Sequence, residues 1–192
     1  MNRSEFSEGA QAAHELILDR YLTYTNWAPT PTNWIHFTNI GDWGNQVVER
    51  SSITEFCQYC NGIKAAAYYH AFKDENGNPL DGSNTSGYVL TFPKRQVPEA
   101  DRFWSVTAYT PEAIELVANP AHKYAVASYT PGLPNPEDGP VSIYMARVLP
   151  AGVPMANWLP IPRGPFNIML RVYGPEGTVE DNTYVPPGIE KR

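Results

Sequence analysis

Three segments of the chain place polar or chemically useful side chains at every second position. They are Tyr68 and His70; Ser105, Thr107 and Tyr109; and Asn167, Met169, Arg171 and Tyr173. Because side chains alternate between the two faces of a β-strand, each group lies on one face of its predicted strand. An arginine flanked by tyrosines and a histidine would bind a carboxylate, a phosphate or a polarised carbonyl. The alternative is a solvated sheet face with ordinary cross-strand pairs.

Histidine is the side chain best suited to proton transfer near neutral pH. Among the four histidines, His70 is our first catalytic candidate and His36 our second. We predict His70 as the proton carrier, Tyr68 and Tyr109 as hydrogen-bond donors, and Arg171 as the partner of an anion or oxyanion. For either histidine, the alternative is an ordinary hydrogen-bonded side chain with a structural role.

Further aromatic and amide side chains complete the predicted site. With His70, Tyr109 and Arg171 as catalytic residues, the predicted substrate-binding residues are Tyr68, His36, Trp104, Asn157, Trp158 and Tyr173. Trp104 also suits a core. Asn157 lies among prolines, where an asparagine commonly holds loop backbone, so the motif around it has an architectural alternative.

Metal and cofactor signatures are weak in this sequence. There is no His-x-His pair of the kind that cupin metalloenzymes use, no glycine-rich phosphate loop and no nucleophile elbow. Cys57 and Cys60 form one Cys-x-x-Cys motif, but no second pair completes a zinc site. We therefore predict no metal and no cofactor, and we predict these cysteines to be small buried apolar residues.

The elements that must position these residues follow from periodicity. Helices are predicted over 4–25 and 45–60, where apolar residues recur at helical spacing. After residue 66 the period changes to two, and strands are predicted over 67–73, 88–92, 103–109, 123–128, 141–148 and 166–173, with a hairpin turn at 74–77. The tail from residue 182 is predicted to lie extended over the surface.

Proline placement narrows the fold class. Sixteen of the 19 prolines lie at or after Pro93, which excludes a helix bundle from the second half of the chain. We predict a single domain over 1–192 that is mainly β, an antiparallel β-sandwich or jelly roll with two N-terminal helices. Residues 1–33 form its N-terminal helix and loop, and 34–188 its β portion.

Composition excludes several classes of protein and partner. The chain has 42% hydrophobic and 18% charged residues, the reverse of a disordered chain. Its net charge is −6 with no basic cluster longer than two residues, which argues against nucleic acid as a partner. No apolar run is long enough to span a membrane, and no apolar signal stretch follows Met1, so we expect a cytoplasmic protein. The first helix makes a homo-oligomer possible.

Four clusters resemble a known family. They are Phe103–Tyr109, Asn119–Tyr124, Asn157–Pro160 and Arg171–Pro175. In this order they resemble the domain-of-unknown-function family 1214, which often follows a companion domain of family 1254. The resemblance covers roughly residues 34–188 and implies a stand-alone domain with a jelly-roll-like β fold. It implies little about chemistry.

Two functional hypotheses follow from these residues. In the first, the chain is a cofactor-independent enzyme that performs acid/base chemistry, as an isomerase, cyclase, lyase or hydrolase would, in an aromatic-lined pocket. Its substrate would be a small, mostly apolar molecule with a polar or anionic group. In the second, it is a non-catalytic module that binds a ligand or carbohydrate, or that serves assembly. Convergence of Tyr68, His70, Tyr109 and Arg171 in an enclosed pocket would favour the enzyme, and an open face would favour binding.

Overall fold

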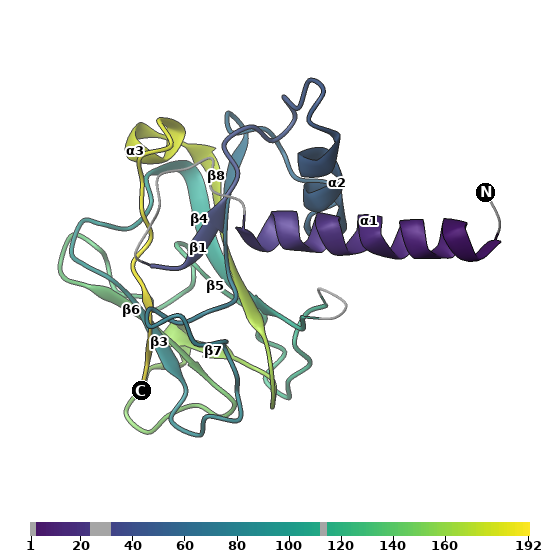
Figure 1. The fold of residues 1–192 in the computed structure, drawn as a ribbon. Coiled ribbons are helices and arrows are strands. Elements are labelled where there is room, and N and C mark those ends of the chain that lie inside the picture. The colour runs from purple at the N-terminus through teal and green to yellow at the C-terminus, as the bar shows by residue number, and fades with distance from the viewer. Residues whose placement is uncertain (1–2, 24–31, 112–114) are drawn as a thin grey trace.

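The computed structural model describes residues 3–23, 32–111 and 115–192. Within these ranges the chain forms nine β-strands in two sheets, three α-helices and one short 3-10 helix, Met155–Asn157. The fold is therefore mainly β, as predicted. Figure 1 shows the two long helices on one side of the strands β8, β4 and β5, with β3, β6 and β7 on the other side.

The larger sheet has five antiparallel strands. In spatial order they are β1 (Trp34–His36), β2 (Ala66–Ala71), β8 (Asn167–Pro175), β4 (Ala100–Tyr109) and β5 (Ala125–Ala127). The central strand β8 pairs along its length with both β2 and β4. Arg171 therefore has Tyr68 directly opposite on one side and Ser105 directly opposite on the other.

The smaller sheet has four strands and is mixed. Its spatial order is β7 (Trp158–Pro160), β6 (Val141–Ala146), β3 (Tyr88–Phe92) and β9 (Ile189–Lys191). The pairs of β3 with β6 and with β9 are antiparallel, whereas β6 and β7 run parallel. The expectation of purely antiparallel sheets is thus wrong at this edge, because the 3-10 helix Met155–Asn157 and the loop before it bring β7 back beside β6 in the same direction.

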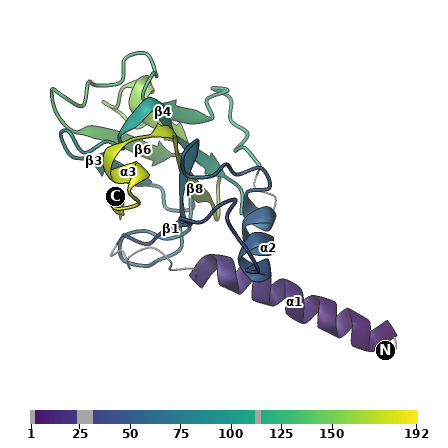
Figure 2. The same cartoon turned by 90° about the horizontal axis from the view of Figure 1, so that it is seen from above.

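The helices differ in how much of their surface they bury. Helix α1 (Arg3–Thr23) packs on α2 (Val47–Phe56) near its C-terminal end, and its N-terminal half projects away from the body (Figure 2). A short third helix, α3 (Gly177–Glu180), follows β8. The predicted helix over 4–25 matches α1 as far as Thr23, and residues 24 and 25 lie outside the described residues. No described helix is long and apolar enough to cross a membrane.

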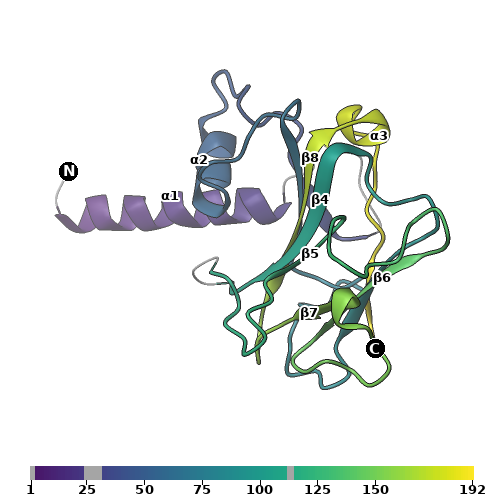
Figure 3. The same ribbon diagram turned by 180° about the vertical axis from the view of Figure 1, so that it is seen from behind.

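Two separate hydrophobic clusters explain the alternation along the central strands. The main cluster contains Ala67 and Tyr69 of β2 and Ile168 and Leu170 of β8, together with side chains of β3 and β6. It is therefore shared by the two sheets, which lie on either side of it in Figure 3. The second cluster joins Tyr21 and Ile53 of the helices to Tyr68 and Met169 on the opposite face of the larger sheet. That opposite face also carries the predicted catalytic residues His70, Tyr109 and Arg171.

Several local predictions need correction. β1, β7 and β9 were not predicted, because three-residue strands show too little periodicity. The turn at 74–77 does not join β2 to β3, because those strands belong to different sheets. It is closed by the bridge between Lys73 and Pro79 and by the hydrogen bond from the Asp74 N–H to the Asn78 carbonyl. The C-terminal tail, predicted to lie over the surface, instead supplies β9 to the smaller sheet.

The Cys-x-x-Cys motif also differs from the prediction. Cys57 and Cys60 are partly buried and form a disulfide, rather than acting as two reduced apolar side chains. Helix α2 ends at Phe56, four residues earlier than predicted, and Cys57 caps it through a backbone hydrogen bond to Ile53. The disulfide closes the turn that follows the helix and leads to Asn61.

Candidate functional site

The candidate site is built around Arg171 on the face of the larger sheet that carries the second cluster. The arginine is half-buried, and its guanidinium carbon lies 5.2 Å from the centre of the Tyr109 ring. Within the described residues, no carboxylate lies within ion-pair distance of Arg171. A cation held over an aromatic ring but lacking a counter-ion is available to an anionic ligand.

Two hydroxyl groups lie beside this arginine. Ser105 stands opposite Arg171 in register, and Thr107 stands opposite Met169, the next residue on the same face. Their exposed fractions are only 9% and 6%, yet neither hydroxyl hydrogen-bonds to any residue that the structure describes. Each hydroxyl can donate and accept a hydrogen bond, so the two add to the binding capacity around Arg171.

Aromatic rings border the arginine toward the far end of β8. The Tyr173 ring stacks on Phe103 at 4.5 Å between centroids, and Phe103 also contacts the exposed Tyr129 edge-on. Partial burial raises the pKa of Tyr173, against the opposing effect of Arg171, so its phenol stays protonated at neutral pH. This border gives an apolar ligand a surface to contact beside the charged group.

Tyr68 is held in place by the turn after the disulfide. Its hydroxyl accepts a hydrogen bond from the Asn61 backbone N–H at 3.0 Å and another from Asn61 Nδ2 at 2.9 Å. The phenol proton of Tyr68 is then left to donate elsewhere. The predicted role of Tyr68 as a hydrogen-bond donor is compatible with this geometry.

His70 lies on the same face but is enclosed. Its exposed fraction is 1%, and both ring nitrogens have partners: the Tyr21 hydroxyl lies 2.6 Å from Nδ1, and Asn167 Oδ1 lies 2.7 Å from Nε2. Asn167 Nδ2 reaches the Thr110 carbonyl at 3.5 Å, which orients its Oδ1 toward the histidine. The proton therefore lies on Nε2, and Tyr21 donates to Nδ1.

Burial sets the protonation of this chain of side chains. Desolvation, together with the nearby Arg171 charge, lowers the pKa of His70 to about 4, although the hydrogen bond to Asn167 acts to raise it. Desolvation likewise raises the pKa of the Tyr21 phenol well above its usual range. At neutral pH both groups are uncharged, so His70 in this arrangement does not carry an exchangeable positive charge.

Two of the predicted residues lie on the other face of the larger sheet. His36 is 1% exposed, stacks on Tyr69 at 4.2 Å, and contacts the Tyr68 carbonyl and Asn182 Oδ1 through its two ring nitrogens. Burial lowers its pKa, so it too is neutral at pH 7. Trp104 belongs to the main cluster beside Phe92. Neither side chain shares a face with Arg171.

The remaining two predicted residues lie at the edge of the smaller sheet, Asn157 in the 3-10 helix before β7 and Trp158 in β7. Asn157 is buried and donates to the Ser142 carbonyl at 2.8 Å, while the Trp158 indole donates to the Ala146 carbonyl at 2.8 Å. Both bonds tie β7 and its preceding turn to β6, which is the architectural role considered for this motif. The structure thus brings together Tyr68, His70, Tyr109, Arg171 and Tyr173, and it places His36, Trp104, Asn157 and Trp158 elsewhere.

Sequence reasoning missed two partners of the site. Tyr21 comes from α1, and its position on the apolar stripe of the predicted helix was the available signal. Asn61 directly follows the helix predicted over 45–60, and nothing in its local sequence indicates a contact with Tyr68. In the described part of the chain, no three His, Cys, Asp or Glu side chains are grouped so as to hold a metal ion.

Comparison with known proteins assigns the chain to a family. A family model described as a protein of unknown function, DUF1214, matches residues 65–177. The chain belongs to the DUF1214 family. The match includes β2, β4 and β8, and so it contains Tyr68, His70, Tyr109, Arg171 and Tyr173. No curated protein matches this DUF1214 chain.

Two solved structures are similar to this DUF1214 chain. The VPA0106 protein from Vibrio parahaemolyticus is 23% identical with a TM-score of 0.64, over 96% of this chain and 42% of that protein. An uncharacterized protein from Burkholderia cenocepacia is 21% identical with a TM-score of 0.44, over 72% of this chain and 32% of that protein. The chain thus spans less than half the length of either. The first likeness shows a shared fold.

Proposed function

We propose that this DUF1214 chain binds a small, mostly apolar molecule through a carboxylate, at the face of the larger sheet around Arg171. The observation that carries the proposal is the half-buried guanidinium, which has no carboxylate partner within the described residues. A single guanidinium matches a single negative charge, and two parallel N–H donors match a carboxylate in geometry. We also propose that the two sheets form a β-sandwich of the jelly-roll kind, as the shared main cluster suggests.

The surroundings of Arg171 support an apolar ligand with one acidic group. The hydroxyls of Ser105 and Thr107 are free to donate to the same anion, and the rings of Tyr109 and Tyr173 offer apolar surface on either side. Partial burial strengthens the attraction, because the charges interact through less water. The proposal places His70 behind this surface as a support.

Binding of small aromatic acids tests the proposal. Ligand-observed NMR would compare phenylacetate with phenylacetamide, which has nearly the same shape and no charge. We expect phenylacetate to bind and the amide to bind at least tenfold more weakly. Arg171→Met should weaken phenylacetate binding by about 10- to 100-fold, the equivalent of about 1.5–3 kcal/mol for a charge-assisted contact.

A matched control distinguishes the loss of this site from the loss of one positive charge elsewhere on the chain. Arg163 is exposed in the loop before β8, and Arg163→Met removes the same charge without touching this face. Binding by the Arg163→Met variant should equal that of the unmodified chain. Equal phenylacetate affinity in the unmodified chain and Arg171→Met would overturn the proposal.

Acid/base catalysis is the second candidate, and the chain of Tyr21, His70 and Asn167 favours it. A neutral histidine that accepts from a phenol can take the phenol's proton while the phenol oxygen takes a proton from the substrate, which leaves an imidazolium and a substrate anion. Such an enzyme would turn over its bound ligand, and His70→Gln would abolish turnover while Arg171-dependent binding persists. A bound ligand that stays chemically unchanged over hours would contradict this candidate. A cytoplasmic location and a homo-oligomer stay predictions.

A further inference from the structure

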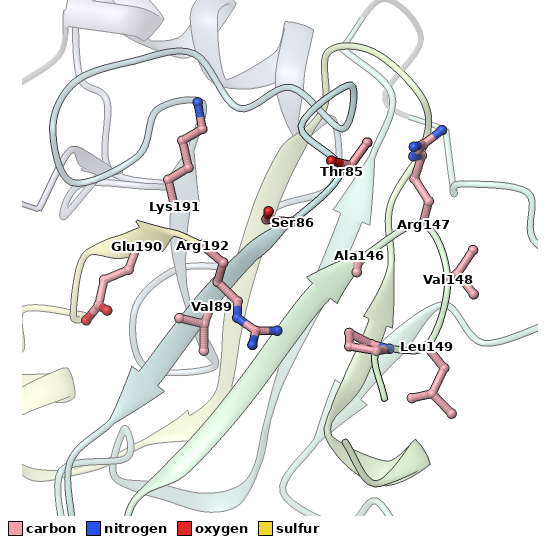
Figure 4. Close-up of a pocket in the computed structure, with 11 residues that line it drawn as sticks. Thr85, Ser86, Val89, Ala146, Arg147, Val148, Leu149, Glu190, Lys191 and Arg192 are labelled. Atoms are coloured by element: carbon pink, nitrogen blue, oxygen red, sulfur yellow. The ribbon is translucent and has the colours of Figure 1, made fainter. Parts of the chain in front are cut away.

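A pocket of about 820 Å³ lies on the smaller sheet, and none of the residues predicted for the site lines it. Its walls come from three parts of the fold: Thr85 and Ser86 before β3, residues 146–150 at the end of β6 and beyond, and residues 190–192 in and after β9 (Figure 4). Segments that lie far apart in the sequence therefore form one cavity.

The turn before β3 depends on a glycine. Gly87 has a φ of +74°, and a Cβ at this position would collide with the Met145 carbonyl of β6. Only glycine lets the chain approach β6 this closely while it turns. The turn therefore brings the hydroxyls of Thr85 and Ser86 to the pocket wall, with Thr85 on the side toward Arg147 and Ser86 farther from it, as Figure 4 shows.

The pocket is lined mainly by positively charged side chains, although the whole chain has a negative net charge. The chain carries a net charge of −6, yet the pocket is lined by Arg147, Lys191 and Arg192 with Glu190 as its one acidic side chain. None of the three cations forms an ion pair with another described residue. In Figure 4 the Glu190 side chain is directed away from Arg147 and Arg192.

One of these cations is fixed in position. The Arg192 guanidinium carbon lies 5.1 Å from the centre of the Tyr144 ring, and the Arg192 backbone N–H donates to the Gly87 carbonyl at 3.0 Å. An arginine held by both its backbone and its ring contact loses less freedom when it binds a ligand. The remaining lining is apolar: Val89 on the sheet, and Val148, Leu149 and Pro150 on the loop.

We propose that this pocket binds a phosphomonoester whose organic part is apolar. Several unpaired cations and two hydroxyls suit a dianion with three terminal oxygens, whereas Arg171 offers one guanidinium. The phosphate lies between the fixed Arg192 and the hydroxyls of Thr85 and Ser86, with Arg147 supplying a second positive charge from the other end of the pocket, and the organic part contacts Val89 and Leu149. The proposal goes beyond the function proposed above, because it uses another sheet and shares no residue with the Arg171 site.

Calorimetric titration with phenyl phosphate and with inorganic phosphate tests the proposal on the full chain. We expect phenyl phosphate to bind at micromolar to millimolar concentration and inorganic phosphate to bind more weakly. The double variant Arg147→Gln with Arg192→Gln should weaken both ligands at least tenfold. Leu149→Gln should weaken phenyl phosphate alone, because inorganic phosphate does not reach the apolar wall.

Controls separate this pocket from the Arg171 site. Arg147, Arg192 and Arg163 are exposed and Leu149 and Arg171 are partly buried, so the variants should fold, which circular dichroism checks. Arg171→Met and Arg163→Gln should leave phenyl phosphate binding unchanged. Absence of binding at 10-fold above the expected range, or equal binding by the double variant, overturns the proposal. Loss of phenyl phosphate binding in Arg171→Met also overturns it and assigns the phosphate to the first site instead.

Discussion

On the sheet face that carries Tyr68 and Met169, the polar side chains at one end have hydrogen-bond partners, whereas those at the other end have none among the described residues. At the paired end, made of Tyr21, His70 and Asn167, the imidazole has a partner on each nitrogen and no access to solvent. At the unpaired end, made of Ser105, Thr107 and Arg171, the described residues supply no hydrogen bond or counter-ion to the hydroxyls or the guanidinium.

The difference separates structural from functional polar groups on one surface. Burying an unpaired polar group costs free energy, so a network with every partner present supports the fold. Groups left without partners near a surface contribute little to the fold and remain available to a ligand. Sequence alone treats His70 and Arg171 as equal members of one site, and the structure distinguishes them by their partners.

Removing the ring of Tyr21 should break the paired end most strongly. Tyr21 stacks on Phe56 at 4.0 Å and is 3% exposed. Tyr21→Ala leaves a cavity and strands His70 Nδ1, so we expect the free energy of unfolding to fall by about 3–5 kcal/mol. Urea denaturation measures the change. Tyr59→Ala removes the same side chain at an 87% exposed position and should cost less than about 0.5 kcal/mol.

Acid should weaken the paired end through His70. Its pKa in the folded chain is about 4, below the ordinary 6.5, so the unfolded chain binds the proton first as pH falls. The stability that neutral His70 provides above pH 6.5 is therefore lost between pH 6.5 and pH 4, by about 2 kcal/mol at pH 5. His70→Gln should reduce the difference in unfolding free energy between pH 7 and pH 5 by that amount. An identical pH dependence in the variant would show that His70 is not buried in solution.

Asn61 binds Tyr68, which lies opposite Arg171 on the neighbouring strand and two residues before His70. Asn61→Ala removes the side-chain donor to Tyr68 and leaves the backbone donor, so we expect a loss of about 0.5–1.5 kcal/mol in the free energy of unfolding. Asn76→Ala gives a control in a turn, because Asn76 contacts Asp74 through its backbone N–H. A stability loss in Asn76→Ala as large as that in Asn61→Ala would remove the special role of the Tyr68 contact.

Substitution at the unpaired end should change the free energy of unfolding least and ligand binding most. Arg171→Met loses one ring contact and no hydrogen bond to a described residue, so the free energy of unfolding should change by less than about 1 kcal/mol. The same variant is the one expected to lose phenylacetate. A loss of several kcal/mol of stability would show that Arg171 belongs with the structural groups after all.

The two ends also show what the sequence could and could not predict. Alternation along β8 was enough to assign Arg171 and Tyr173 to one face and Leu170 to the core, because strand geometry fixes side-chain direction. It could not show that α1 closes over His70, because that depends on packing across 49 residues. Asn157 and Trp158 looked like site residues because polar and aromatic side chains serve turns and ligands equally well.

The pairing of β9 with β3 has a consequence for how the chain folds during synthesis. Lys191 pairs with Tyr88, about a hundred residues earlier, and β8 pairs with β2 across a similar distance. Such long-range contacts form slowly, since a long loop must close before they add stability. Until residues 189–191 have been synthesised and have paired, the outer edge of β3 is unpaired and the pocket proposed above lacks one wall. An unpaired strand edge can pair with another chain, so this interval is when the smaller sheet is most open to edge-to-edge association.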